Sequence, residues 1–139
     1  MQPVSGCINL KIKQKRISSC TLLFQNAGKR GQNNMVISGF KMKVFEGYEE
    51  EYERRHDLIW PEMKEMLFEY GCKTFSIFLD KETRILFGYL EVEDEARWND
   101  RAQNEINKKW WDYMADIMET NPDNSPVSID LKKVFHMSK

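Results

Sequence analysis

The hydrophobic pattern of residues 35–139 changes period several times, and the order of these changes limits the fold more than any other feature. Val36 to Phe45 alternates apolar residues with lysines, the two-residue period of a strand with one buried face. Cys72 to Leu79 and Ile85 to Val92 are rich in Phe, Ile, Leu and Tyr and predict a hairpin. Val127 to Met137 predicts a final strand.

Helical patterns separate these strands. Tyr48, Tyr52 and His56 recur every four residues and so share one helix face. Pro61 cannot lie inside a helix but suits the first position of a new one, and Gly71 suits its end, so the first helical region is predicted to break just before the proline. In the second helical region Asp94 and Asn104 are candidate N-caps, and the predicted inward residues are Ile106, Trp110, Tyr113, Met114 and Ile117.

The order βαββαβ predicts the ferredoxin-like α+β architecture, a four-stranded antiparallel sheet with helices on one face. The strand Ile85 to Val92 is apolar on both sides, so the face without helices also needs a cover. A second copy of the chain would supply it, which predicts a homodimer of the dimeric α/β barrel type.

Charge divides the chain into two parts. Residues 1–34 hold six Lys and Arg and no acid, which leaves fifteen basic against twenty-two acidic residues for the domain 35–139. We interpret residues 1–34 as a flexible basic extension, with Met35 as the functional start, and rank this above a transit peptide. A body this acidic argues against nucleic-acid binding, and no apolar run reaches the roughly 20 residues of a membrane span.

Few motifs of known chemistry are present. Three cysteines without close pairing favour a reducing, cytoplasmic location and argue against a metal site. The sequence has no phosphate loop, dinucleotide fingerprint, serine elbow or HExxH motif, so cofactor-free proton transfer or ligand binding remains.

Histidine can exchange protons near neutral pH, and His56 is one of two histidines; His136 is the weaker candidate. On residue type alone, a solvated helix histidine is the commoner case. Trp110 and Trp111 could present aromatic faces to a sugar, although such a pair is usually core. The acidic residues around His56, from Glu49 to Asp57, could orient its ring or simply be solvated.

Several motifs in register carry a resemblance that covers essentially all of residues 35–139. They are Tyr52-Glu-Arg-Arg-His56 with Ile59-Trp-Pro-Glu62, Leu79-Asp-Lys81, Arg97-Trp-Asn99, Lys109-Trp-Trp111 with Tyr113-Met114, and Asn121-Pro-Asp-Asn-Ser-Pro-Val-Ser128. Together they resemble the L-rhamnose mutarotases, isomerases that interconvert the α and β anomers of the sugar.

The resemblance implies a catalytic His56, sugar contacts from Tyr52, Trp110 and Trp111, and a homodimer without metal or other cofactor. One departure stands out. Members of that family carry a sugar-contacting tyrosine where this chain has Phe75, which can stack on a ligand but cannot hydrogen-bond to it.

Two other classes remain as alternatives. Dimeric barrels of this kind include cofactor-free monooxygenases and small-ligand-binding modules, which the fold alone does not exclude. An inactive sugar binder, in which Phe75 has ended catalysis, is the third reading.

Overall fold

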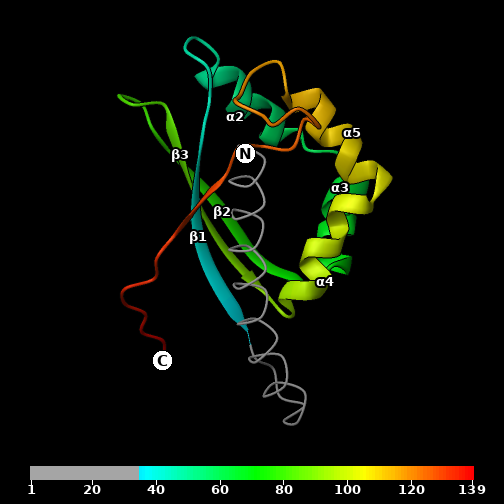
Figure 1. Cartoon of the computed structure of the whole chain (residues 1–139), viewed down its shortest axis with the longest axis vertical. Helices are drawn as coiled ribbons and strands as arrows, with labels where there is room; N and C mark the ends of the chain where they lie inside the picture. The colour runs from blue at the N-terminus through cyan, green and yellow to red at the C-terminus, as the bar shows by residue number, and fades with distance from the viewer. Residues whose placement is uncertain (1–34) are drawn as a thin grey trace, which may run out of the picture. The chain divides into compact units, whose positions relative to one another are not determined.

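Four antiparallel strands form a single sheet in residues 35–139, the part of the chain that the computed structural model describes (Figure 1). The strands are β1 (Val36–Lys43), β2 (Cys72–Asp80), β3 (Ile85–Val92) and β4 (Ile129–Leu131), in the spatial order β2-β3-β1-β4. The predicted ferredoxin-like fold is therefore confirmed. The predicted basic extension falls on residues 1–34, outside the described residues.

The described helices cover one face of this sheet (Figure 1). They are α2 (Glu49–Asp57), α3 (Pro61–Glu69), α4 (Glu95–Asp100), the 3-10 helix η1 (Arg101–Gln103) and α5 (Glu105–Met114). Pro61 is the first residue of α3, so the chain breaks between α2 and α3 as predicted. Gly71 follows α3 with a φ of 96°, a left-handed conformation that suits glycine.

Side-chain caps fix where the second helical region begins. The carboxylate of Asp94 accepts hydrogen bonds from the backbone N–H groups of Ala96 and Arg97. The amide oxygen of Asn104 likewise accepts from the first turn of α5. Both caps were predicted, and each satisfies backbone N–H groups that have no partner within the helix.

A hydrophobic core fills the space between the sheet and the helices. Its buried members come from every layer and include Met42, Val44, Tyr52, Met63, Met66, Leu86, Trp110, Met114, Ile117 and Met118. The prediction that Tyr113 faces inward was wrong, since 37% of it is exposed. Trp110 and Met114 are one turn apart and occupy the inner face, which turns Tyr113 toward the edge.

The prediction of a long final strand was wrong in extent. β4 pairs with β1 only from Gly39 to Lys41, after which the chain leaves the sheet (Figure 1). Val134 and Phe135 are 84% and 76% exposed, so no described residue covers this end of the chain. A segment is a strand only where a neighbouring strand supplies its hydrogen bonds. The apolar sequence of this segment does not show whether such a neighbour is present.

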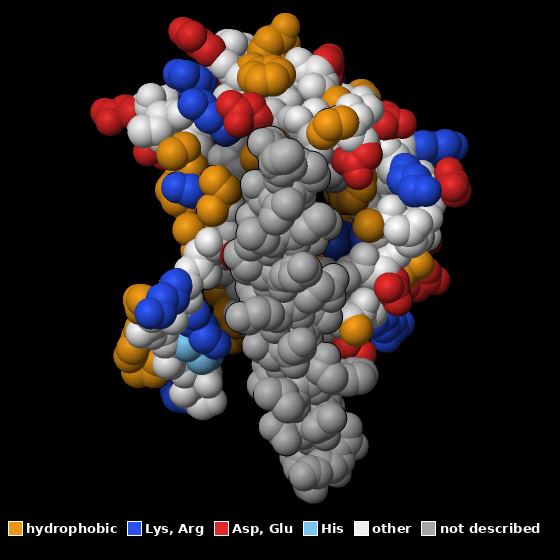
Figure 2. Space-filling model, viewed as in Figure 1, with side chains coloured by type: hydrophobic (Ala, Val, Ile, Leu, Met, Phe, Trp, Pro, Cys, Tyr) orange, Lys and Arg blue, Asp and Glu red, His pale blue; other side chains and the backbone are white. Residues whose placement is uncertain are grey.

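The sheet face away from the helices is apolar, as the two-sided pattern of β3 predicted. Leu86, Leu90 and Val92 are buried against the helices, whereas Phe87 points to the other face and is 38% exposed. Phe78 lies opposite Phe87 in the β2–β3 register and is 64% exposed. Apolar side chains are visible along the strand side of the domain and on the segment after β4 (Figure 2).

Candidate functional site

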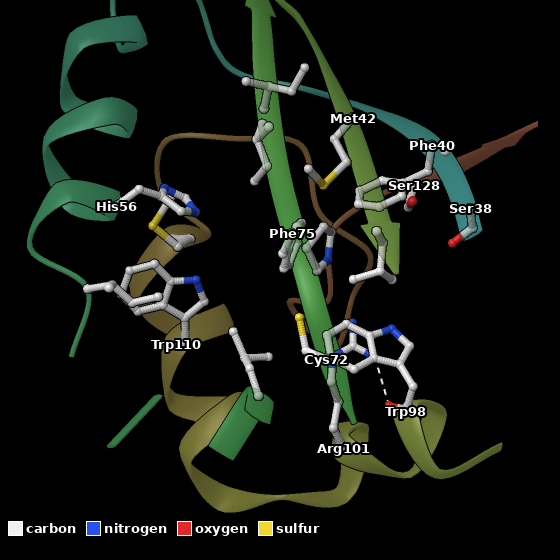
Figure 3. Close-up of a pocket in the computed structure, with 18 of the residues that line it drawn as sticks. Ser38, Phe40, Met42, His56, Cys72, Phe75, Trp98, Arg101, Trp110 and Ser128 are labelled. Carbon is white, nitrogen blue, oxygen red and sulfur yellow. Dashed lines mark hydrogen bonds between the residues drawn. The ribbon is translucent and has the colours of Figure 1, made fainter. Parts of the chain in front are cut away.

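A cavity of about 1450 Å³ lies between the helix-covered face of the sheet and the helices (Figure 3). Its volume exceeds the roughly 300–1,000 Å³ of typical small-molecule sites, so a monosaccharide has ample room. All five residues predicted from the sequence line it, namely Tyr52, His56, Phe75, Trp110 and Trp111. His136 is exposed and does not line it.

The His56 ring is held in one tautomer by the backbone. Its Nδ1 lies 3.0 Å from the carbonyl oxygen of Tyr52, one turn earlier in α2. A carbonyl oxygen can only accept a hydrogen bond, so Nδ1 carries the proton and donates it. In the neutral ring Nε2 is then left with a lone pair, so this nitrogen can accept a proton.

Aromatic rings fix the orientation of His56. The ring of Tyr52 stacks on it with 4.4 Å between centroids, and Trp110 meets it edge to face at 5.3 Å. Burial lowers the pKa of His56 below its usual 6.5, although the Tyr52 carbonyl and Asp57 oppose this effect. The neutral, proton-accepting form is therefore the dominant one at neutral pH.

The acidic residues of α2 do not orient this ring, contrary to one reading of the sequence. The backbone carbonyl of Tyr52 takes that place. Glu51 instead accepts hydrogen bonds from Arg54 at 2.7 Å and from Arg55 at 2.7 Å. These bonds, led by that from Arg54, lower the pKa of the Glu51 carboxyl to about 2.

Arg55 joins α2 to the end of α5. Its guanidinium donates to Asp116 at 2.9 Å and to the carbonyl of Tyr113 at 2.5 Å, and it lies 4.3 Å from the centre of the Tyr113 ring. Only 11% of its side chain is exposed. The contacts hold the helix that carries His56 against the helix that carries the tryptophans.

Tyr52 and the tryptophan pair complete the wall around His56. Tyr52 is 7% exposed, and burial raises the pKa of its phenol, so the hydroxyl stays protonated and can donate. Trp110 is 6% exposed and packs edge to face on Trp60 at 5.1 Å, while Trp111 is only partly buried. Both indoles line the cavity.

Phe75 lies in β2 on the opposite wall of the cavity. Its ring packs edge to face on Phe40 at 6.1 Å and on Trp98 at 6.2 Å, and 38% of the residue is exposed (Figure 3). This position therefore offers a ligand an aromatic face without a hydrogen-bond donor or acceptor.

Within residues 35–139, no three His, Cys, Asp or Glu side chains are grouped so as to hold a metal ion. No helix in that range is long and apolar enough to cross a bilayer.

Known proteins of similar sequence cover this domain almost end to end. The family model "L-rhamnose mutarotase" matches residues 38–137. The L-rhamnose mutarotase of Lachnoclostridium phytofermentans is 62% identical over 103 residues, which are 74% of this chain and 99% of that protein. The L-rhamnose mutarotase of Bacteroides thetaiotaomicron is 58% identical over the same shares of the two chains.

The chain belongs to the L-rhamnose mutarotase family. Membership agrees with a solved structure, the L-rhamnose mutarotase FA22100 of Formosa agariphila, which is 50% identical with a TM-score of 0.69 and covers 74% of this chain and 99% of its own. A putative antibiotic biosynthesis monooxygenase from Bacteroides thetaiotaomicron reaches a TM-score of 0.50 at 16% identity, over 76% of this chain and 95% of its own, and shares the fold alone.

The sequence analysis did not predict two polar residues that line the cavity. Asn107 and Arg101 line the cavity from α5 and η1. Asn107 had a usable signal, since it lies three and four residues before the tryptophan pair and so shares a helix face with it. Arg101 had none, because a lone arginine after a short helix is usually solvated.

Proposed function

We propose that this chain interconverts the α and β anomers of L-rhamnose, as an isomerase that requires no cofactor and works in the cytoplasm. Family membership supports the activity. The observation that carries the chemistry is the bare Nε2 of His56, a proton acceptor that shares one cavity with aromatic side chains. Cys72, a free and buried thiol, is consistent with a reducing compartment.

The reaction needs one proton removed and one supplied. Nε2 of His56 takes the proton from the anomeric hydroxyl while the bond between the anomeric carbon and the ring oxygen breaks, and the ring oxygen takes up a proton from water. The open-chain aldehyde rotates about its bond to the next carbon, and the reverse steps close the other anomer. On closure, the ring oxygen returns its proton to water, and protonated His56 returns the first proton to the anomeric oxygen. His56 ends each cycle neutral, so it is both the general base and the general acid.

Tyr52 assists in this proposal, and the aromatic residues bind. The Tyr52 ring is stacked on His56, and its protonated hydroxyl can fix a sugar hydroxyl or relay a proton. Trp110, Trp111 and Phe75 present flat apolar surfaces that suit the C–H faces of a pyranose.

A sugar panel tests the activity. Saturation-transfer NMR measures exchange between anomers for L-rhamnose, L-fucose and D-glucose, with and without the protein. We expect acceleration to be largest for L-rhamnose. Exchange of L-rhamnose at the rate of the protein-free sample would refute the proposal.

The pH dependence of catalysis should report the lowered pKa of His56. The base form is needed, so kcat/KM should reach a plateau at neutral pH and should fall on acidification with a midpoint below the usual histidine value of about 6.5. Unfolded chains protonate His56 more readily than the folded chain, so folding stability also declines below about pH 6.5. Circular dichroism must therefore show intact folding at each pH. A midpoint above 6.5 would contradict the assignment.

The proposal includes a homodimer formed through the outer face of the sheet. Phe78, Phe87, Ile129 and Leu131 expose 38–64% of their surfaces there. A two-fold interface must be self-complementary. This face meets that requirement because it carries both charges, Lys41 and Lys43 on β1 and Asp80 and Glu91 on the other strands. The exposed apolar segment after β4 extends from the same edge and would lie on the second copy.

Phe87→Glu should convert the dimer to a monomer, because a charged carboxylate would replace an apolar ring in the interface of each copy. Sedimentation velocity at micromolar concentration measures the mass. Leu58→Glu is the matched control, since Leu58 is 63% exposed at the end of α2 and should leave the mass unchanged. A monomeric wild-type chain would contradict the dimer.

A further inference from the structure

One buried amide in the cavity lacks a hydrogen-bond partner. Asn107 is 1% exposed, and it is the only buried polar residue among residues 35–139. Its Nδ2 has no partner in the described part of the chain, although this nitrogen carries two hydrogens. A buried donor left unpaired costs free energy, so such groups usually mark a missing acceptor.

The helix aims Asn107 at the same space as the tryptophans. Asn107, Trp110, Trp111 and Met114 lie at i, i+3, i+4 and i+7 of α5, and all four line the cavity. Neighbours at these spacings are about 5–6 Å apart between Cβ atoms. A ligand stacked on the indoles is therefore within reach of the amide.

A second donor without an acidic partner lies at the end of the cavity away from His56 (Figure 3). Arg101 donates one hydrogen bond to the Trp98 carbonyl at 3.1 Å, and its guanidinium lies 4.0 Å from the centre of the Trp98 ring. No carboxylate of residues 35–139 forms an ion pair with it. Burial lowers its pKa to about 10, so it still carries its charge at neutral pH.

The aromatic rings beside Arg101 offer it no further acceptor. The Trp98 ring supports the guanidinium and meets Phe75 edge to face, and neither ring accepts a conventional hydrogen bond. The remaining N–H groups of Arg101 and the Nδ2 of Asn107 are therefore free to donate to oxygen atoms of a ligand in the cavity.

We infer that Asn107 and Arg101 form a donor pair that binds hydroxyl oxygens of the sugar on the side remote from the anomeric carbon, and that this pair determines which sugars are accepted. The inference rests on the proposed function, which assigns the anomeric carbon to His56. The ligand class is a neutral pyranose with one face stacked on indole and with hydroxyls directed toward η1 and the start of α5.

The test removes the donors one at a time and the hydroxyls one at a time. Asn107→Leu keeps the volume but has no donor, and Asn107→Asp keeps the shape but replaces the donor with an acceptor. We expect KM for L-rhamnose to rise about 5- to 10-fold in each, with kcat nearly unchanged, as for one lost hydrogen bond. Arg101→Met should have a similar effect, which Arg101→Lys should partly restore.

Deoxy sugars show whether the lost bond is the inferred one. The 3-deoxy or 4-deoxy analogue of L-rhamnose that lacks the contacted hydroxyl should have a raised KM with wild type, and Asn107→Leu or Arg101→Met should raise it little further. If each variant raised KM for both analogues by the same factor as it raises KM for L-rhamnose, the inference would be overturned.

Other outcomes separate this inference from the proposed function. Wild-type KM values in both Asn107→Leu and Arg101→Met, with altered melting temperatures, would show a purely structural role and overturn the inference while the activity stands. If wild type shows no anomer exchange, the proposed function fails, and NMR titration of L-rhamnose still measures binding. Equal affinities of wild type and variants in that titration would overturn the inference; weaker affinities in the variants would support it.

Discussion

Replacing His56 with alanine should reduce the catalysed exchange between L-rhamnose anomers by about 10²- to 10⁴-fold, the usual contribution of a positioned acid–base group. The uncatalysed reaction is measurable in water, so a loss of this size returns exchange close to the protein-free rate. The loss should appear in kcat more than in KM, because in the proposed mechanism Nε2 transfers a proton in the transition state, whereas the aromatic rings bind the sugar.

The other histidine supplies the matched control. His136 is exposed and does not line the cavity, so His136→Ala should keep wild-type exchange. Removing His56 also removes its stacking on Tyr52, and a melting curve must therefore show that His56→Ala is folded. A folded His56→Ala chain with wild-type exchange would refute the assignment of His56.

The fold was predictable because its signals are local. Pro61 and Gly71 bound α3, and Asp94 and Asn104 cap the helices that follow, each through chemistry that involves only a few neighbouring residues. The length of β4 was not predictable in this way. A strand exists only where another strand supplies its hydrogen bonds, and β1 does so only from Gly39 to Lys41.

The sequence predicted five residues that line the candidate cavity, but it did not predict the hydrogen bonds and charges around them. Helical spacing places Tyr52 beside His56, yet sequence alone did not show that a backbone carbonyl, rather than one of five nearby carboxylates, holds the ring. Arg101 was missed for a similar reason. Its burial depends on Trp98 and on the cavity between the layers, which is a property of the packed fold.

Replacing Trp110 with alanine should have the largest effect on stability, lowering the free energy of unfolding by about 3–5 kcal/mol, as for a buried tryptophan truncated to alanine. Trp110 is 6% exposed and contacts His56, Trp60 and Tyr113, so its removal leaves a cavity at the junction of α2, α3 and α5. For a domain of this size each kcal/mol lowers Tm by roughly 4–8 °C, which thermal denaturation followed by circular dichroism resolves easily.

Trp111→Ala is the comparison that separates packing from binding, since Trp111 lines the same cavity but is only partly buried. It should lower Tm much less than Trp110→Ala while raising KM for L-rhamnose, because its exposed face is free to meet the sugar. Equal losses of Tm in the two variants would mean that both indoles are core. An unchanged KM in Trp111→Ala would remove this tryptophan from the sugar site and would leave the stacking surface to Trp110 and Phe75.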